Sequence, residues 1–180
     1  MDENQTGDMA ADAIIVMGVS GCGKSSTAAL LADRIGARFI EGDALHPRAN
    51  IEKMRQGFPL DDNDRWPWLD RIGAVLGEAV ASGTPVIISC SALKKAYRDR
   101  LRKATGGPLA FVYLEGPEEI LADRMSRREG HFMPLSLLKS QIATLEVPSG
   151  EAGVVTVSIA GTPEEICTAA LEKLMTLHFA

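Results

Sequence analysis

The sequence contains few of the features that mark secreted, membrane-spanning or nucleic-acid-binding proteins. Its three cysteines, Cys22, Cys90 and Cys167, are too few and too widely spaced for a disulfide framework or a zinc site. No apolar run approaches the length of a membrane span. The formal net charge is −5 and no basic run occurs, which argues against nucleic acid as a partner. These absences favour a protein of the reducing cytoplasm that binds neither a membrane nor nucleic acid.

The remaining composition is that of an ordinary globular domain. Hydrophobic residues make up 46% of the chain and charged residues 24%. The 180 residues are enough for one domain with a substantial core, which we expect over residues 13–180. Residues 1–12 are polar and lack the basic start and apolar centre of a signal peptide, so we expect a disordered tail there.

One segment, residues 18–25, matches the phosphate-binding pattern G-x-x-x-x-G-K-[ST]. The apolar run 13–17 before it is typical of a buried strand, and residues 26–35 after it have apolar side chains at helical spacing. This order of strand, glycine-rich loop and helix disfavours the alternative, a glycine-rich turn that matches by chance. We therefore predict a nucleotide-binding loop formed by Gly18, Val19, Ser20, Gly21, Cys22, Gly23, Lys24, Ser25 and Ser26.

The residue types in this loop explain how it would hold a nucleotide. Its glycines allow a tight turn without a Cβ that would block a phosphate. The loop amides and the helix amino end direct partial positive charge at an anion. Lys24 adds a full charge for the β- and γ-phosphates, and the Ser25 hydroxyl can ligate Mg²⁺. The sequence therefore predicts ATP and Mg²⁺ as cofactors, with Lys24 as a catalytic residue.

The rest of the chain alternates short apolar strands with amphipathic helices. Besides the first strand, we expect strands at 38–41, 86–90, 109–114 and 154–159, and helices at 47–56, 65–82, 94–104, 117–128, 135–145 and after the capping box that begins at Thr162. Five such strands predict an α/β three-layer sandwich around a five-stranded parallel sheet. Ligands of such sheets bind beyond the carboxyl ends of the strands. Insertions at about 44–65 and 127–150 are the candidate acceptor-binding segment and lid.

Two carboxylates follow the second predicted strand. Glu41 and Asp43 would point to the same face of an extended chain, toward the mouth of the site. A phosphotransferase needs one carboxylate to orient and deprotonate the accepting hydroxyl, and acidic groups that assist Mg²⁺. We assign Asp43 the first role and Glu41 the second, through a magnesium-bound water; the alternative is a solvated turn. His46 could hydrogen-bond a polyol or a carboxylate, or could simply begin the next helix.

Cationic side chains near the strand ends are candidates for binding an anionic acceptor. Lys94 and Arg98 lie at the start of a basic helix after the third strand, and Lys53 lies in the first insertion. The alternative for each is a solvated surface residue. The third strand ends without the metal-binding acid of many ATPases, which shifts magnesium binding toward Ser25 and Glu41.

Arginines also precede the break at residues 130–134. Arg124, Arg127 and Arg128 have helical spacing and suit a lid that closes over ATP, bringing charge to the transferring phosphoryl group. We take Arg124 and Arg128 as catalytic candidates. Removing a true phosphoryl-stabilising arginine should lower turnover by roughly 10³-fold or more. In the alternative, an exposed basic helix, the loss would have almost no effect.

Two other patterns have ordinary explanations. Trp66 and Trp68 flank a proline, and packing at a helix start is favoured over stacking on a sugar. The D-x-x-G match at residues 70–73 lies inside a periodic helix, and the sequence has no N-K-x-D guanine motif. We therefore do not assign the chain to the GTPases.

Several blocks together resemble the gluconokinase family, over about residues 13–148. They are MGVSGCGKS at 17–25, GDALHP at 42–47, NIEKM at 50–54, PLDDNDR at 59–65, CSALKK at 90–95, YRD at 97–99 and GHF at 130–132. The GDALHP and CSALKK blocks are far more discriminating than the phosphate loop alone. Glu41 stands where relatives commonly have aspartate, and residues 133–134 are also less typical of the family.

This resemblance implies ATP-dependent phosphorylation of D-gluconate to 6-phosphogluconate, feeding the pentose phosphate or Entner–Doudoroff route. The implied fold is the shikimate-kinase-like branch of the nucleoside monophosphate kinases, often dimeric. Asp43 would then contact the acceptor hydroxyls, Arg124 and Arg128 would belong to the lid, and His131 would lie at the lid near the substrate. The alternative function, from another class, is a nucleotide-dependent switch or regulatory binding module.

Overall fold

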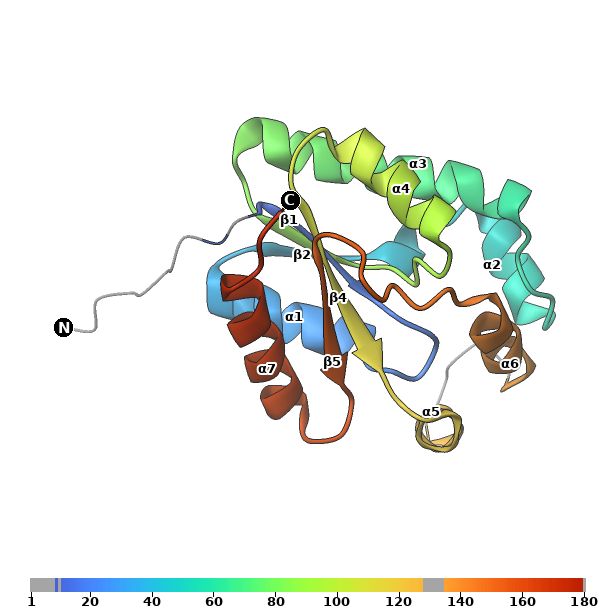
Figure 1. Cartoon of the computed structure of the whole chain (residues 1–180). Helices are drawn as coiled ribbons and strands as arrows, with labels where there is room; N and C mark the ends of the chain where they lie inside the picture. Colours follow the sequence, from blue (N-terminus) through green and yellow to red (C-terminus); the bar gives the residue numbers. More distant parts are fainter. Residues whose placement is uncertain (1–8, 10, 128–134, 180) are drawn as a thin grey trace.

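The computed structural model describes residues 9, 11–127 and 135–179, and its centre is a parallel β-sheet (Figure 1). The strands are β1 (Ala13–Met17), β2 (Arg38–Glu41), β3 (Val86–Ser89), β4 (Leu109–Glu115) and β5 (Val154–Ser158). They pair in the order β2-β3-β1-β4-β5, and every pair is parallel. The predicted fold class is confirmed. Because the strands are parallel, the loops that follow β1, β2 and β3 meet at one edge.

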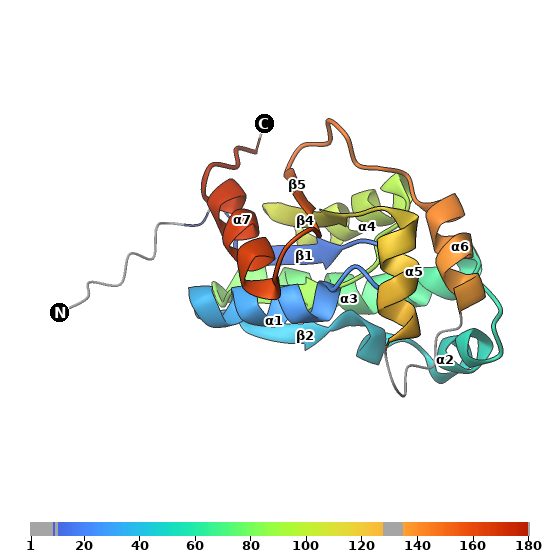
Figure 2. The same cartoon turned by 90° about the horizontal axis from the view of Figure 1, so that it is seen from below.

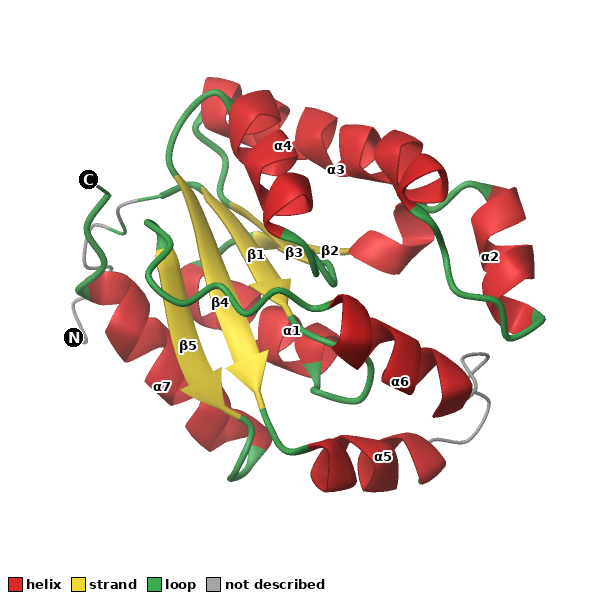
Figure 3. Ribbon diagram, turned by 45° about the vertical axis from the view of Figure 1, so that its right-hand side comes forward, coloured by secondary structure: helices red, strands yellow, loops and turns green. Residues whose placement is uncertain are grey.

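Helices cover both faces of the sheet and extend beyond its carboxyl edge. α1 (Lys24–Ile35) and α7 (Pro163–Met175) pack on one face, and α3 (Asp62–Ser82) and α4 (Lys95–Thr105) pack together on the other (Figures 1 and 2). α2 (Arg48–Arg55), α5 (Glu118–Ser126) and α6 (Leu135–Thr144) lie beyond the strand ends (Figure 3). Among the described residues, no helix is long and apolar enough to cross a membrane.

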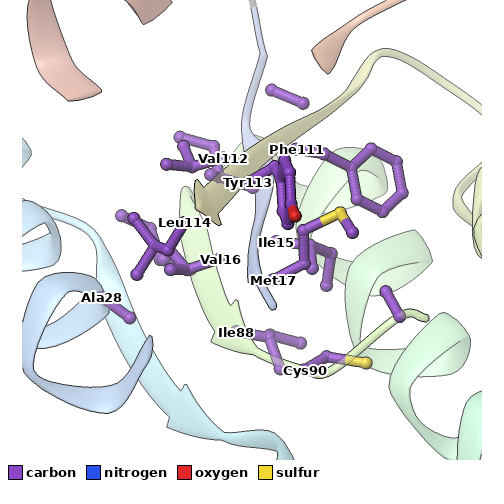
Figure 4. Packing of buried hydrophobic residues seen from close by; sticks show 14 of the residues in the cluster. Ile15, Val16, Met17, Ala28, Ile88, Cys90, Phe111, Val112, Tyr113 and Leu114 are labelled. Carbon is purple, nitrogen blue, oxygen red and sulfur yellow. The ribbon is translucent and has the colours of Figure 1, made fainter. Parts of the chain in front are cut away.

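The core lies between the central strands and the helices on both faces. All five residues of β1 are buried, as expected for a strand covered on both sides. Figure 4 shows Val16 and Leu114 on the side of Ala28 from α1, while Ile15 and Phe111 point to the opposite face. This alternation follows the two-residue period of a strand. The edge strands β2 and β5 are only partly buried. The rigid centre fixes where the loop after β1 begins.

Most predicted element boundaries are correct to within two residues, but two differences affect the site. α3 begins at Asp62 rather than near residue 65, because Asp61 and Asp64 form a capping box. Residues Gly42–Leu45 form a short 3-10 helix, η1, where we expected extended chain. The capping box that begins α7, formed by Thr162 and Glu165, is confirmed.

A close approach between the ends of β2 and β3 fixes the start of η1. A Cβ atom at Gly42 would lie 1.9 Å from the carbonyl oxygen of Ser89, so no side chain fits there. The Gly42 amide donates to Ser89 Oγ at 3.2 Å, and the Gly42 carbonyl accepts from Trp68 Nε1 at 2.8 Å. Gly42 is therefore held from two sides, and the flanking acids Glu41 and Asp43 are held with it.

Candidate active site

The predicted phosphate loop connects the end of β1 to the start of α1. Gly18, Gly21 and Gly23 have φ angles of 144°, 85° and 88°, which other residues rarely adopt. Gly23 is the N-cap of α1 and has no side chain that could occupy the first helix amides. Lys24 Nζ donates to the carbonyl of Val19 at 3.2 Å, which places the ammonium group over the loop. The loop therefore offers amides and one cation to a phosphate chain.

Two cavities open beside this loop. The first encloses about 520 Å³, including its open mouth, and is lined by Ser20, Lys24, Asp43, His46, Met54, Pro59, Leu60, Arg65, Trp68, Ser91, Leu137, Ser140 and Gln141. The second encloses about 680 Å³ and is lined by Gly21, Cys22, Gly23, Ser26, Thr27, Arg124, Arg127, Gly161, Pro163 and Ile166. We call them the Asp43 cavity and the Arg124 cavity.

Asp43 and Lys24 line the same cavity, as the predicted chemistry requires. Asp43 lies in η1, and its side chain is 48% exposed, so its carboxylate is accessible to a ligand. The expectation that Glu41 and Asp43 share one face of an extended chain is wrong, because η1 turns the backbone between them. Only Asp43 of the two lines the cavity; Glu41 points to neighbouring hydroxyls.

Glu41 bridges two serines at the sheet edge. Its Oε2 accepts from Ser25 Oγ at 2.5 Å and its Oε1 accepts from Ser89 Oγ at 2.6 Å. Oxygen atoms of this kind are what Mg²⁺ prefers, so Ser25 and Glu41 fit the predicted metal role. No group of three or more His, Cys, Asp or Glu side chains suited to a metal occurs in the described part of the chain. A magnesium ion here would therefore draw its other ligands from phosphate and water.

His46 is buried in the wall of the Asp43 cavity. Its ring stacks on Trp68 with centroids 4.0 Å apart, and its Nε2 lies 3.8 Å from Asp43 Oδ1. Burial, and next the charge of Arg65, lower the pKa of His46 to about 4, so it is neutral at pH 7. The Asn50 amide group donates to the backbone carbonyl of Asp64 at 2.8 Å and contacts His46 Nδ1 at 3.2 Å. Nδ1 then accepts, and the ring proton lies on Nε2, the nitrogen nearer Asp43.

Two of the predicted acceptor-binding cations lie outside this cavity. Lys53 Nζ pairs with Asp64 at 2.6 Å, and Lys94 Nζ pairs with Asp62 at 3.2 Å. These hydrogen bonds raise the pKa values of both lysines and lower that of Asp64. The pKa of Asp62 is lowered chiefly by its hydrogen bond from Tyr97 and next by that from Lys94. Neither lysine lines the cavity. The structure therefore does not bring Lys53 and Lys94 to the site, because neighbouring acids hold them.

Arg98 has a structural place instead of the predicted one in substrate binding. Its side chain is fully buried, and its guanidinium group pairs with Glu151 at 2.6 Å. It also donates to the backbone carbonyls of Ala92, Leu93 and Glu146 at 2.8–3.1 Å. This arginine connects the loop after β3 to the segment after α6, and no donor is directed at a ligand. The assignment of Arg98 to the acceptor is corrected on this basis.

Arg65 is the cation that sequence reasoning missed. It lines the Asp43 cavity, is only 7% exposed and donates through Nη1 to the Tyr97 hydroxyl at 2.8 Å. One signal was available in the sequence. Arg65 lies on the buried stripe of α3, four residues before Leu69 and seven before Ile72, where an apolar residue is expected. A charged residue at a core position indicates a specific role.

The Arg124 cavity is lined by Arg124, one of the two arginines predicted to act on the phosphoryl group. Arg124 lies opposite the loop residues Gly21 to Thr27, with Nη2 donating to the carbonyl of Ile159 at 2.8 Å. Gly161 and Pro163, at the start of α7, also line this cavity and were not predicted. Arg128 and His131 lie outside the described residues.

α6 brings a further unpredicted side chain to the loop. Gln141 Oε1 accepts from the backbone amide of Ser20 at 2.8 Å and from Ser20 Oγ at 3.2 Å. Leu137 and Ser140 of the same helix also line the Asp43 cavity. No sequence motif marks these residues. Their placement depends on how α6 packs over the strand ends (Figure 3).

The fold and the phosphate loop define the chain as a P-loop phosphotransferase. Two cavities open beside that loop. The family described as "AAA domain" matches residues 14–148. Gluconokinase of Gluconobacter oxydans is 50% identical, over 92% of this chain and 90% of that protein. Thermosensitive gluconokinase of Escherichia coli is 48% identical, over 79% and 76%. The crystal structure of a gluconokinase from Sinorhizobium meliloti is 54% identical over 93% of each chain, with a TM-score of 0.83. The chain belongs to the gluconokinase family.

Proposed function

We propose that this chain transfers the γ-phosphoryl group of ATP to the C6 hydroxyl of D-gluconate, giving 6-phospho-D-gluconate and ADP. The family supplies the substrate class. The observation that carries the proposal is that Lys24 of the loop and Asp43 of η1 line one cavity of about 520 Å³. A phosphate-binding cation and a carboxylate are thereby brought to one open cavity.

The chain's own residues suggest how ATP is held. The amides of residues 18–26 and the amino end of α1 receive the phosphates, and Lys24 leaves the Val19 carbonyl to contact the β- and γ-phosphates. Ser25 would be a ligand of Mg²⁺, and Glu41 would assist through its hydrogen bond with Ser25 or through a water. When bound, Mg²⁺ neutralises charge that develops on the phosphate oxygens.

Asp43 acts on the acceptor. Its carboxylate accepts the proton of the C6 hydroxyl as that oxygen bonds to the γ-phosphorus and the bond from the γ-phosphorus to the β–γ bridging oxygen breaks. The electron pair of the broken bond remains on ADP. His46, neutral and protonated on Nε2, donates to an acceptor oxygen beside Asp43. Because His46 is neutral, it does not form an ion pair with Asp43, and the Asp43 carboxylate can accept the proton of the C6 hydroxyl.

The segment 127–150 remains our proposed lid, and residues 44–65 our proposed acceptor-binding insertion. Five residues of the second segment line the Asp43 cavity: His46, Met54, Pro59, Leu60 and Arg65. The contact between Gln141 and Ser20 supports the lid, since it connects α6 to the phosphate loop. Arg124 remains a candidate for phosphoryl stabilisation, and Arg128 and His131 remain candidates from the sequence alone.

The wider setting is also a proposal. Three free, buried cysteines support a reducing compartment, and ATP is available in the cytoplasm. Family resemblance alone supports a homodimer, which light scattering would test. The product would enter the pentose phosphate or Entner–Doudoroff route.

A panel of acceptors tests the proposed function. ADP release with ATP is measured for D-gluconate, shikimate and nucleoside monophosphates, and the phosphorylated product is identified by ³¹P NMR. We expect turnover with gluconate and a phosphomonoester on its primary carbon. Turnover of another acceptor with gluconate inert would reject the assignment. Tight nucleotide binding without turnover of any acceptor would favour a nucleotide-dependent switch instead.

A further inference from the structure

Arg65 differs from the other cations near the Asp43 cavity in how its charge is compensated. Lys53, Lys94 and Arg98 each pair with a carboxylate within 3.2 Å. None of the described carboxylates forms an ion pair with Arg65, although the side chain is 93% removed from solvent. A buried guanidinium group without an anion is unfavourable. An anionic ligand that enters the cavity would compensate it.

The orientation of Arg65 is fixed by a chain of hydrogen bonds. Arg65 Nη1 donates to the Tyr97 hydroxyl, which in turn donates to Asp62 Oδ1. The guanidinium carbon also lies 5.3 Å from the centre of the Tyr97 ring. Tyr97 therefore holds one side of the guanidinium group, and the other N–H groups of Arg65 form no hydrogen bond within the described part of the chain. A planar fork of donors matches a carboxylate.

The position of Arg65 relative to the reacting groups is also informative. Asp43, His46 and Arg65 line one cavity, and Arg65 is near enough to His46 for its charge to contribute to the lowered pKa of that ring. Asp43 and Lys24 belong to the end where phosphoryl transfer occurs. An acceptor that places a hydroxyl at Asp43 and a carboxylate at Arg65 would use two groups of this one cavity.

We propose that Arg65 binds the carboxylate of the acceptor and thereby selects sugar acids over uncharged polyols of the same length. Tyr97 is a positioning residue that orients Arg65 without touching the acceptor. The assignment rests on the proposed function, because it names the group that recognises one end of gluconate. It replaces Lys94 and Arg98, which the sequence suggested for this role.

The test compares a charged and an uncharged ligand in one variant. D-Glucitol has a CH₂OH group in place of the gluconate carboxylate, so its inhibition constant against gluconate reports binding without the ion pair. In Arg65→Gln, we expect kcat/KM for gluconate to fall by on the order of 10²–10³-fold, as for other buried charge pairs that lose one partner. The inhibition constant of D-glucitol and the KM for ATP should change by less than about threefold.

Matched variants make the result specific. Arg55→Gln removes an exposed arginine of α2 and should leave every constant unchanged. Tyr97→Phe keeps the charge of Arg65 but frees its orientation, so the KM for gluconate should rise roughly tenfold with little change in kcat. A merely structural role for Tyr97 would lower stability without this separation of KM from kcat.

Three outcomes would overturn the assignment. Arg65→Gln with the constants of Arg55→Gln would remove it, and so would equal weakening of gluconate and D-glucitol. Should Arg65→Gln fail to fold, Arg65→Lys decides by the same two ligands: at least a tenfold selective loss for gluconate supports the proposal, and no selective loss contradicts it. If the unsubstituted protein does not phosphorylate gluconate, the proposed function fails; if it does, only the role of Arg65 is at stake.

Discussion

The two cavities beside the phosphate loop are built from different parts of the chain. Half of the residues that line the Arg124 cavity come from one short stretch, Gly21 to Thr27, and the others come from α5 with its C-cap and from the region of α7. The Asp43 cavity is formed by side chains of the loop, η1, α2, α3 and α6, which are distant in sequence. Many of these side chains depend on another for position, as His46 does on Trp68. The Arg124 cavity, which we propose holds the nucleotide, is therefore encoded in part by one local motif, whereas the Asp43 cavity depends mainly on tertiary packing.

The largest expected effect is that of Asp43→Asn, which replaces one carboxylate oxygen with an amide NH₂ group and should separate turnover from ATP binding. Asp43→Asn keeps the shape of the Asp43 cavity but removes the base, so kcat should fall by roughly 10²–10⁴-fold. ATP binding, measured by calorimetry with a non-hydrolysable analogue, should stay within about threefold, because Asp43 does not line the Arg124 cavity.

Lys24→Met is the contrasting variant for Asp43→Asn. Lys24 belongs to the phosphate loop and lines the Asp43 cavity, so its loss should weaken ATP binding as well as turnover. If Asp43→Asn lost nucleotide binding to the same degree, Asp43 would be structural and the two sides would not be separable.

Acid should destabilise the protein through the Asp43 cavity. The folded pKa of His46 is about 4 and its ordinary value is 6.5, so between these values the unfolded chain takes up a proton that the folded chain does not. Stability from this group is complete above pH 6.5 and falls as the pH decreases. The loss between pH 6.5 and 5 should be about 2 kcal/mol, measured by urea unfolding.

His46→Gln should remove this component of the pH dependence. The control is His178→Gln, since His178 is exposed near the end of the chain. The window stops at pH 5 because the lowered pKa values of Asp62, Asp64, Asp99 and Glu151 put their titration below it. An unchanged slope in His46→Gln would show that His46 is not the group responsible.

The next prediction concerns Glu41, which we propose assists the binding of Mg²⁺. Glu41→Gln keeps a polar side chain between Ser25 and Ser89 but lacks the negative charge, so the Mg²⁺ concentration for half-maximal turnover should rise roughly 10–100-fold. Binding of Mn²⁺ in the presence of ADP, followed by electron paramagnetic resonance, gives a readout independent of turnover. Glu115→Gln, at the exposed end of β4, is the control. Equal metal requirements in the two variants would remove Glu41 from the metal site.

The smallest expected effect concerns the nucleotide side. Arg124 lines the Arg124 cavity and not the Asp43 cavity, so Arg124→Gln should raise the KM for ATP roughly tenfold, the value of one charge-assisted hydrogen bond, with kcat little changed. Arg100→Gln is the control, because that arginine is exposed, pairs with Asp70 and lines neither cavity. A fall in kcat of roughly 10³-fold in Arg124→Gln would instead assign it to the transferring phosphoryl group.

The sequence predicted the parts of this molecule that depend on local pattern. The strand before the loop, the helix after Gly23 and the five-stranded parallel sheet all follow from short-range periodicity and glycine placement. Asp43 was also predicted, because its place after β2 puts it at the sheet edge.

The parts that depend on distant partners were not predictable in the same way. Arg98 and Arg65 are both buried arginines, but only the fold shows that Arg98 forms an ion pair with Glu151 and that Arg65 forms none with a described acid. The sequence suggested that Lys53 and Lys94 bind an anion, because it does not show that they pair with Asp64 and Asp62 of α3. Gln141 reaches the loop from 121 residues away, and no local signal exists for such a contact.

Gly42 has a consequence for how this enzyme could diversify. Even a methyl group at this position would collide with the Ser89 carbonyl. Single substitutions of Gly42 therefore cannot adjust the spacing between Glu41 and Asp43. Arg65, by contrast, projects from α3 and donates to Tyr97 rather than to Gly42, so its substitution removes neither hydrogen bond of that junction. New acceptor preferences would therefore arise on the helices around the cavity, while the reacting carboxylate keeps its place beside the loop.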